Sequence, residues 1–184
     1  MVELAKKYDS VKDTYDKFTY SYVEVKAVVA ESTDEDAEPA LPTEAAIADA
    51  LAKCDSMLAK MNDEGMSLAD AAKAVVSTAE VKEQKDVAGS ELETALSSWL
   101  VSSERQEGDV TTVRGSDGAY IVVFTSRNNN QEKTAESGDM NYCDYIANGL
   151  LRSESYSNWT AENLDPVSEK AEIKTAFGMN YVGR

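Results

Sequence analysis

The sequence contains no histidine among its 184 residues, and this absence removes several kinds of catalytic site. A Ser-His-Asp or Cys-His site is impossible, because both need an imidazole as general base. A metal site would have to use carboxylates alone, and the acidic run Asp34-Glu35-Asp36 lacks the spacing of an EF-hand loop. A glycine-rich phosphate-binding loop is missing as well. We therefore expect no metal and no cofactor.

Basic residues are scarce. The 34 acidic residues outnumber the 18 Lys and Arg residues, which leaves a net charge of −16. Such a surface repels phosphate backbones and anionic lipids, so the charge argues against nucleic-acid binding. The simplest role of this acidic surface is solubility, and electrostatic steering of a basic partner is the alternative.

Cysteines and long apolar runs are also few. The two cysteines, Cys54 and Cys143, fit no C-x-x-C or zinc spacing, and a disulfide between them is the less favoured alternative to two thiols. Cys54 falls on the apolar face of an expected helix, where cysteine acts as a small buried hydrophobe. No apolar stretch is long enough to span a membrane, and no signal peptide follows Met1. Either the protein is cytoplasmic or its leader has been removed.

The first part of the chain predicts a helix, a strand and a loop. Residues 3–16 carry apolar or aromatic groups at helical spacing. Residues 18–29 alternate aromatic and small polar side chains and then continue with valines, which is typical of a strand. Residues 31–39 are acidic with almost no apolar content, so we expect a solvated loop there.

Three helices are expected next. Thr43 can cap the first, over 44–61, whose apolar stripe comprises Ile47, Leu51, Cys54, Leu58 and Met61. Ser67 can cap a second, whose inward residues are Leu68, Ala71, Ala72, Val75 and Val76. Residues 77–89 are polar and weakly patterned. Ser90 and Glu93 form a capping box that predicts a third helix bearing Leu92, Leu96, Trp99 and Leu100.

The remainder predicts a hairpin followed by a helix. Short strands at 110–113 and 119–125 flank a reversal at 115–118 that is rich in Gly, Ser and Asp. A helix is expected from about 140 to 159, with packing residues Tyr142, Tyr145, Ile146, Leu150 and Trp159, and a short strand at 179–182. The fold class is therefore α+β, with a small antiparallel sheet and packed helices.

Four segments in this order resemble the parvulin (rotamase) family of prolyl isomerases. Residues 21–26 (SYVEVK) match its first strand, of R-H-I-L-V type, and 65–72 (GMSLADAA) match its F-A-x-L-A helix start. Residues 107–113 (EGDVTTV) match its G-E-V-S-x-P-V strand, and 118–124 (GAYIVVF) match its G-Y-H-I-I-K-V strand. The most specific part is the pair of closing segments.

This resemblance implies a division of the chain. Residues 18–127 would form a parvulin-like or FKBP-like domain, after an N-terminal helix in 1–17. Residues 128–184 would supply a linker, a C-terminal helix that packs with the N-terminal helix, and a tail. Within the domain, we expect strand 18–29 to lie antiparallel beside strand 118–125, with helix 44–61 packed across both.

The chain also departs from the family pattern. Tyr22 and Tyr120 occupy the two positions where the family places histidines, and the family's glycine-rich G-G-x-L-G-x-F segment is replaced by a polar stretch from Thr78 to Gly89. The two tyrosines are the candidate pocket residues, and Tyr20, Trp99 and Val122 are candidate substrate-binding neighbours. The alternative for Tyr22 and Tyr120 is an aromatic cross-strand pair that only packs.

The expected function follows from this resemblance to secreted foldases and chaperones of Gram-positive anaerobes. It implies an extracytoplasmic module, secreted or membrane-anchored, that binds unfolded or proline-containing polypeptide without isomerase catalysis. A weak prolyl isomerase is one alternative, because twisting an X–Pro bond needs no nucleophile. A structural or dimerising domain is another. Exposed apolar side chains on 3–16 or 140–159 would favour the chaperone function.

Overall fold

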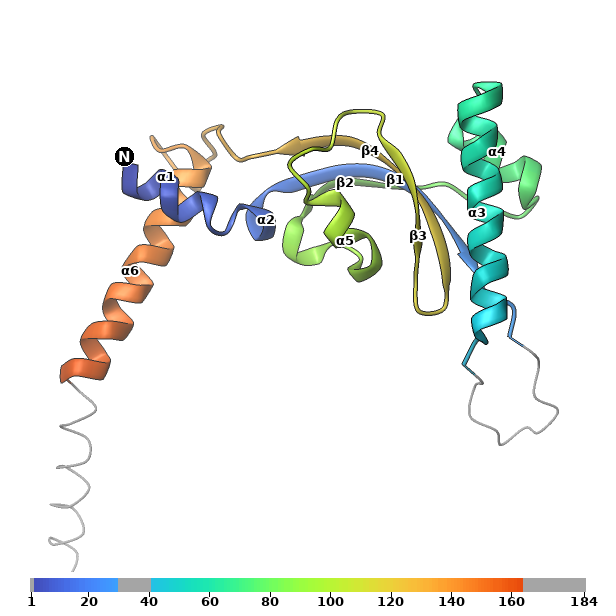
Figure 1. The fold of residues 1–184 in the computed structure, drawn as a ribbon. Helices are drawn as coiled ribbons and strands as arrows, with labels where there is room; N and C mark the ends of the chain where they lie inside the picture. The colour runs from blue at the N-terminus through green and yellow to red at the C-terminus, as the bar shows by residue number, and fades with distance from the viewer. Residues whose placement is uncertain (1, 30–40, 164–184) are drawn as a thin grey trace, which may run out of the picture. The chain divides into compact units, whose positions relative to one another are not determined.

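The structure, a computed structural model, describes residues 2–29 and 41–163 (Figure 1). The expected loop at 31–39 and the strand expected at 179–182 thus lie outside the described residues. The chain divides into two compact units. One is Lys12–Asn129, and the other combines Met1–Val11 with Asn130–Arg184.

The larger unit, Lys12–Asn129, contains a four-stranded antiparallel sheet. Its strands are β1 (Lys17–Lys26), β2 (Lys82–Ala88), β3 (Val110–Arg114) and β4 (Gly118–Asn128), in the order β2-β1-β4-β3. β1 pairs with β4 along its whole length, from Lys17 opposite Asn128 to Lys26 opposite Gly118. The predicted α+β class and the predicted neighbours in the sheet are therefore confirmed.

Strand β2 lies in the polar stretch that predicted no regular element. It is an edge strand, and all seven of its residues are exposed or half-buried. Because both faces of such a strand meet water, its sequence KEQKDVA shows no alternation of apolar and polar residues. Backbone pairing with β1, from Lys17 opposite Ala88 to Tyr22 opposite Lys82, therefore defines this strand.

Helices α3 (Glu44–Glu64) and α4 (Leu68–Val75) cover one face of the sheet (Figure 1). Thr43 and Ser67 cap them as predicted, each accepting a backbone N–H at 3.2 Å. Gly65 ends α3 in the left-handed region at φ +66°, which favours glycine. The core here joins sheet residues and helix residues, namely Val23, Val25, Ala119 and Ile121 with Ala50, Cys54, Met57, Leu68, Ala71 and Ala72.

Helix α5 (Thr94–Leu100) covers the other face of the sheet. A second core lies there, made of Phe18, Tyr20, Tyr22, Leu92, Leu96, Leu100, Tyr120, Val122 and Phe124. The capping-box prediction was wrong, because residues Gly89–Glu91 form a short 3₁₀ helix and α5 begins only after Glu93. Packing decides this: the Gly89 N–H donates to the Asp16 carbonyl at 2.9 Å, and a Cβ at Gly89 would lie 1.8 Å from the Asp13 carbonyl oxygen.

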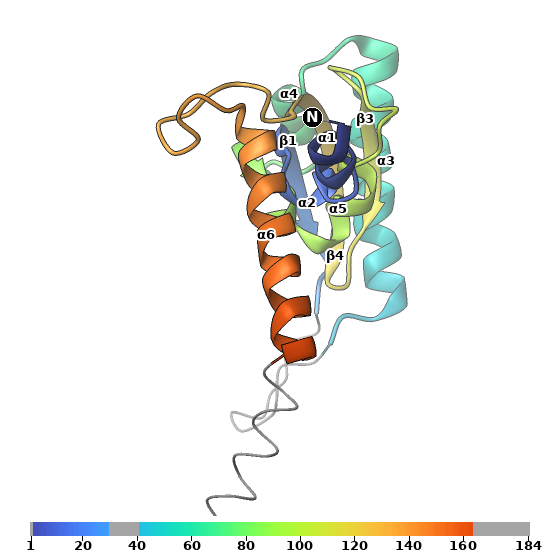
Figure 2. The ribbon, with the colours of Figure 1, turned by 90° about the vertical axis from the view of Figure 1, so that its left-hand side faces the viewer.

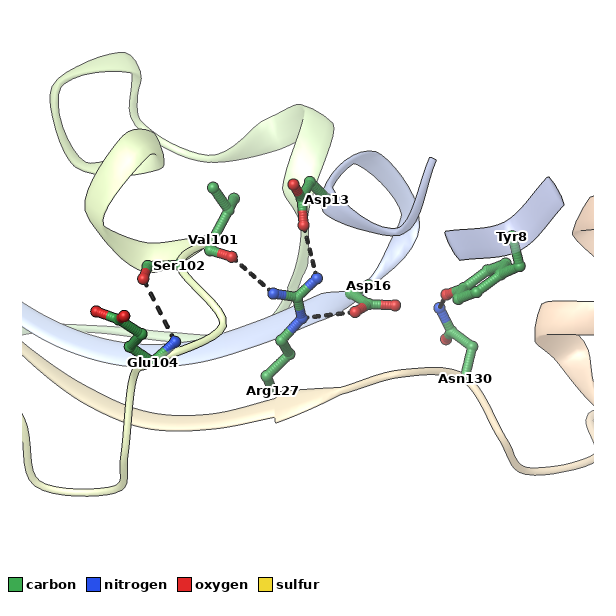
Figure 3. A network of polar contacts seen from close by, with 8 residues as sticks. All are labelled: Tyr8, Asp13, Asp16, Val101, Ser102, Glu104, Arg127 and Asn130. Atoms are coloured by element: carbon green, nitrogen blue, oxygen red, sulfur yellow. Dashed lines mark hydrogen bonds and ion pairs between the residues drawn. The ribbon is translucent and has the colours of Figure 1, made fainter. Parts of the chain in front are cut away.

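Arg127, near the end of β4, holds several segments of this unit together (Figure 3). Its guanidinium donates to Asp16 at 2.6 Å, to Asp13 at 2.8 Å and to the Val101 carbonyl at 2.7 Å. It also lies over the Phe18 ring, 5.1 Å from the centroid. One side chain thus ties β4 to the loop after α5 and to α2 (Lys12–Tyr15) with its following residue.

The smaller unit consists of helix α1 (Val2–Asp9) packed against α6 (Tyr142–Asn163), which is a single long helix (Figure 2). A Lys7–Glu154 ion pair joins the two helices, and the Asn130 amide donates to the buried Tyr8 hydroxyl at 2.8 Å (Figure 3). Only the N-terminal turns of α6 are buried, at Cys143 and Ala147.

Two expectations about the flanking helices were wrong. Residues 3–16 do not form one helix, because the chain turns after Asp9: the Ser10 hydroxyl donates to the Lys7 carbonyl at 2.7 Å and the Val11 N–H to the Tyr8 carbonyl at 2.9 Å. α2 then belongs to the larger unit. Trp159 does not pack in a core either, since its side chain is 52% exposed.

Candidate functional site: a tyrosine-lined pocket

A pocket of about 510 Å³ opens on the α5 side of the sheet. It is bounded by the end of β1, the start of β4, the start of β2, the start of α5 and the reversal 115–118. The reversal is fixed by two backbone hydrogen bonds of 2.9 Å, from Gly115 to Gly118 and from Ala27 to Asp117. All of these segments belong to the larger unit.

Tyr22 and Tyr120 both line this pocket. Strand alternation places them on the same face, and register makes them diagonal neighbours, because Tyr22 lies opposite Val122 and Tyr120 opposite Glu24. Their ring centroids are 6.0 Å apart at an interplanar angle of 51°. The sheet therefore brings together the two residues that the sequence nominated.

The hydroxyls of these two tyrosines have no hydrogen-bond partner among the described residues. The side chains are nonetheless deeply packed, with 8% of Tyr22 and 6% of Tyr120 exposed. The hydroxyl oxygens themselves are not among the buried atoms that lack a partner in the described residues, so both reach solvent in the pocket. Here the rings belong to the core, and the pocket is the space from which a partner can reach both groups.

Glu24 and Lys82 form the side of the pocket nearest β2. Lys82 Nζ lies 2.8 Å from Glu24 Oε2 and 5.5 Å from the centroid of the Tyr22 ring. The hydrogen bond to Glu24 raises the pKa of Lys82, so the ammonium is retained at any physiological pH. The Tyr22 ring is thus already in contact with one cation.

Two further carboxylates, Glu93 and Asp117, lie on the exposed rim of the pocket. Neither forms a side-chain ion pair or hydrogen bond with any described residue. Arg114, which also lines the pocket, is paired with Glu44 on α3. The cations beside the pocket are therefore each paired with another carboxylate, whereas Glu93 and Asp117 are not.

These carboxylates act on the Tyr120 hydroxyl. Burial first, then the negative charges of Glu24, Glu93 and Asp117, raise the pKa of Tyr120 to about 12. A phenol with this pKa stays protonated at neutral pH and can donate a hydrogen bond. Chemically, the pocket offers phenol donors, aromatic ring surface and a negative rim.

The other nominated residues lie near the pocket and do not line it. Tyr20 is 2% exposed, with its ring 5.9 Å from that of Tyr22, and burial raises its pKa. Val122 is fully buried in the sheet. Trp99 on α5 lies against the Arg105 guanidinium, 4.9 Å from the ring centroid, outside the pocket lining.

The sequence did not nominate Glu24, Lys82, Glu93 or Asp117. A signal existed for Glu24, because it lies two residues after Tyr22 and so must share its face of the strand. Lys82 gave no signal, since its polar stretch predicted no strand. Glu93 was assigned to a capping box, and Asp117 to a turn, and neither assignment shows that the two residues face the same cavity.

The described residues contain no cluster of three or more Cys, Asp or Glu side chains able to hold a metal ion. Cys54 and Cys143 are both buried and form no disulfide. Within the same described ranges, no helix combines the length and apolar character that crossing a membrane requires.

A scan against protein-family models finds no match, and searches of curated proteins and of solved structures find none either.

Proposed function

We propose that this protein binds extended polypeptide as a foldase or chaperone module of parvulin-like type, without imidazole-based catalysis. The observation that carries the proposal is the pair of buried tyrosines whose hydroxyls have no partner in the described protein and which line one pocket. Two hydroxyls that open to the pocket beside aromatic rings form a recognition surface, because each can donate a hydrogen bond to a ligand and accept one from it.

An extended polypeptide has the complementary chemistry. Each of its residues carries a backbone carbonyl that needs a donor once it leaves water. The Tyr120 phenol, whose pKa is raised to about 12, remains such a donor. Proline or other apolar side chains of the client can lie on the rings, as apolar contact with aromatic surface is favourable.

The parvulin-like part of the proposal has two supports. The family motifs implied that the first strand pairs with the last, and β1 lies antiparallel beside β4. Tyr22 and Tyr120, at the positions that correspond to the family's histidines, lie across the same pocket with their rings 6.0 Å apart. An extracytoplasmic location is part of the same proposal and rests on the resemblance alone.

Exposed aromatic side chains on α6 support the chaperone function. Tyr156 is 66% exposed and Trp159 52% exposed, and their rings stack with centroids 6.4 Å apart. Large apolar groups left in water on one helix are a typical contact surface for another chain. Exposed apolar side chains on this helix were the feature expected, from the sequence, to distinguish a client-binding function from a purely structural one.

The test is binding of a fluorescent, unstructured peptide with a central proline, followed by anisotropy. Tyr22→Phe and Tyr120→Phe keep the rings and delete the hydroxyls, so each should weaken binding about 2- to 10-fold, the value of one hydrogen bond. Tyr145→Phe, in the other unit and outside the exposed pair of Tyr156 and Trp159, is the matched control and should leave binding unchanged. Unaltered affinity in both pocket variants would reduce the tyrosine pair to core packing and refute the proposal.

The same hydroxyl pair favours a second candidate function, weak prolyl isomerisation. A phenol both donates and accepts, so two of them can hydrogen-bond a twisted amide and lower its barrier. Uncatalysed isomerisation takes on the order of 10–100 s, so a protease-coupled assay has a measurable baseline. We expect little or no acceleration, together with delayed light scattering of a denatured client. Acceleration that Tyr22→Phe abolishes would favour the isomerase instead.

A further inference from the structure

The charges around the pocket do not cancel. Lys82 is paired with Glu24 at 2.8 Å, and Arg114 is paired with Glu44, a residue of α3 that does not line the pocket. The pKa of Lys82 is raised by its hydrogen bond to Glu24 and, to a smaller extent, by the charge of Glu93, but neither Glu93 nor Asp117 forms an ion pair in the described part of the chain. An entering ligand therefore meets negative charge on the rim before it reaches the tyrosines.

The aromatic floor is suited to a positive group as well. Lys82 already places its ammonium 5.5 Å from the Tyr22 ring centroid, which shows that this ring accepts a cation on its face. The two hydroxyls that lack partners lie on the same floor. A cationic side chain on the rim and a backbone carbonyl on the floor would satisfy both sets of groups together.

A bare metal ion fits the pocket poorly. The carboxylates on the rim do not converge, because the described residues contain no group of three acidic or cysteine side chains within metal-binding range. A Lys or Arg side chain needs no such convergence, as its charge can lie between two separated carboxylates and its stem covers ring surface. Both features favour an organic cation.

We propose that the pocket selects client segments carrying a Lys or Arg side chain beside the bound backbone, with Glu93 and Asp117 as its specificity-determining residues. This inference rests on the proposed polypeptide binding and names the class of polypeptide. The overall charge of −16 acts in the same direction at long range, because an acidic protein attracts basic chains before contact. Selectivity itself comes from the rim.

The test uses three fluorescent, unstructured peptides that differ only in the residues flanking a central proline, which are Lys, Gln or Glu. At low ionic strength we expect the Lys peptide to bind about five-fold more tightly than the Gln peptide, with the Glu peptide weakest. The difference should shrink as salt is added. The double variant Glu93→Gln/Asp117→Asn should abolish the difference, so that the Lys and Gln peptides bind with similar affinity.

A matched control separates the rim from the net charge. Asp63→Asn/Glu107→Gln removes the same charge from exposed positions outside the pocket, so it should retain the preference for Lys. Equal loss of preference in both double variants would overturn the subsite. Equal affinity for the Lys and Gln peptides would overturn it too, while leaving polypeptide binding intact. If the native protein binds none of the three peptides, the proposed function itself fails.

Discussion

Removing the Arg127 side chain should destabilise the larger unit more than any other single charge change there. Arg127 is only 17% exposed, and its partner Asp16 is 2% exposed, so Arg127→Ala deletes the guanidinium from a carboxylate that stays buried. The carbonyl of Val101 loses a donor as well, and the Phe18 ring loses its stacked cation. Figure 3 shows the three segments that this side chain joins.

The size of the effect follows from burial. Breaking a buried ion pair by removing one partner costs about 3–5 kcal/mol, because the remaining charge is left in a medium that solvates it poorly. A whole domain has only about 5–15 kcal/mol of stability, so this loss approaches the point of unfolding. Asp13→Asn removes the other partner, whose side chain is 59% exposed, and should cost about 0.5 kcal/mol after screening by solvent.

Urea unfolding of the larger unit can be followed by itself. The chain has two tryptophans, and Trp99 lies in the larger unit while Trp159 lies on α6. In a Trp159→Phe background, fluorescence therefore reports the unfolding around Trp99. We expect Arg127→Ala to lower the midpoint without changing the slope, and Arg127→Met/Asp16→Asn to recover part of the loss because neither charge remains.

Two results would contradict this reasoning. A cost below about 1 kcal/mol for Arg127→Ala would mean that water solvates Asp16 in the variant, so that its burial does not matter. Equal costs for Arg127→Ala and Asp13→Asn would mean that the exposed pair, and not the buried one, provides the stability.

Three further predictions test other parts of the fold. Gly118→Ala should cost about 2 kcal/mol or more in urea unfolding, since its Cβ would lie 2.2 Å from the Val25 carbonyl oxygen, whereas Gly149→Ala, with nothing within 4 Å, should stabilise α6 by about 1 kcal/mol. Cys54 should resist thiol reagents at pH 8 until the protein unfolds, because it is fully buried and burial, followed by the Asp55 charge, raises its pKa to about 12. Burial also raises the pKa of Tyr120 from 10.0 to about 12, so the folded state holds this proton more tightly than the unfolded state. The free energy of unfolding should therefore fall as the pH rises from about 10 to about 12. Urea midpoints that fall equally for Tyr120→Phe over this pH range would contradict the assignment to Tyr120.

Much of the helical and hairpin structure is encoded locally and was predictable. Thr43, Ser67 and Gly65 mark the ends of α3 and α4 because a cap acts on backbone groups only a few residues away. The reversal at 115–118 and the apolar run after it define the β3–β4 hairpin for the same reason. The absence of histidine is equally independent of folding, and it alone excludes imidazole chemistry.

The pairing of β2, the start of α5 and the break between α1 and α2 needed the tertiary structure. Each depends on contacts between segments distant in sequence. β2 forms by pairing with β1, and the segment before α5 is held by the hydrogen bond from Gly89 to the Asp16 carbonyl. α2 separates from α1 because it packs within the larger unit. Periodicity reports which side of an element is apolar, and an exposed edge strand has no apolar side to report.

The pocket shows the same division. The sequence determined that Tyr22 and Tyr120 lie on strands, and the ordered motifs nominated them together. Only the sheet register made them neighbours, and only the folded chain brought Glu93 and Asp117 to their rim from a helix start and a turn. A charged residue on the surface carries no local trace of which cavity it will face, because that is decided by how distant elements pack.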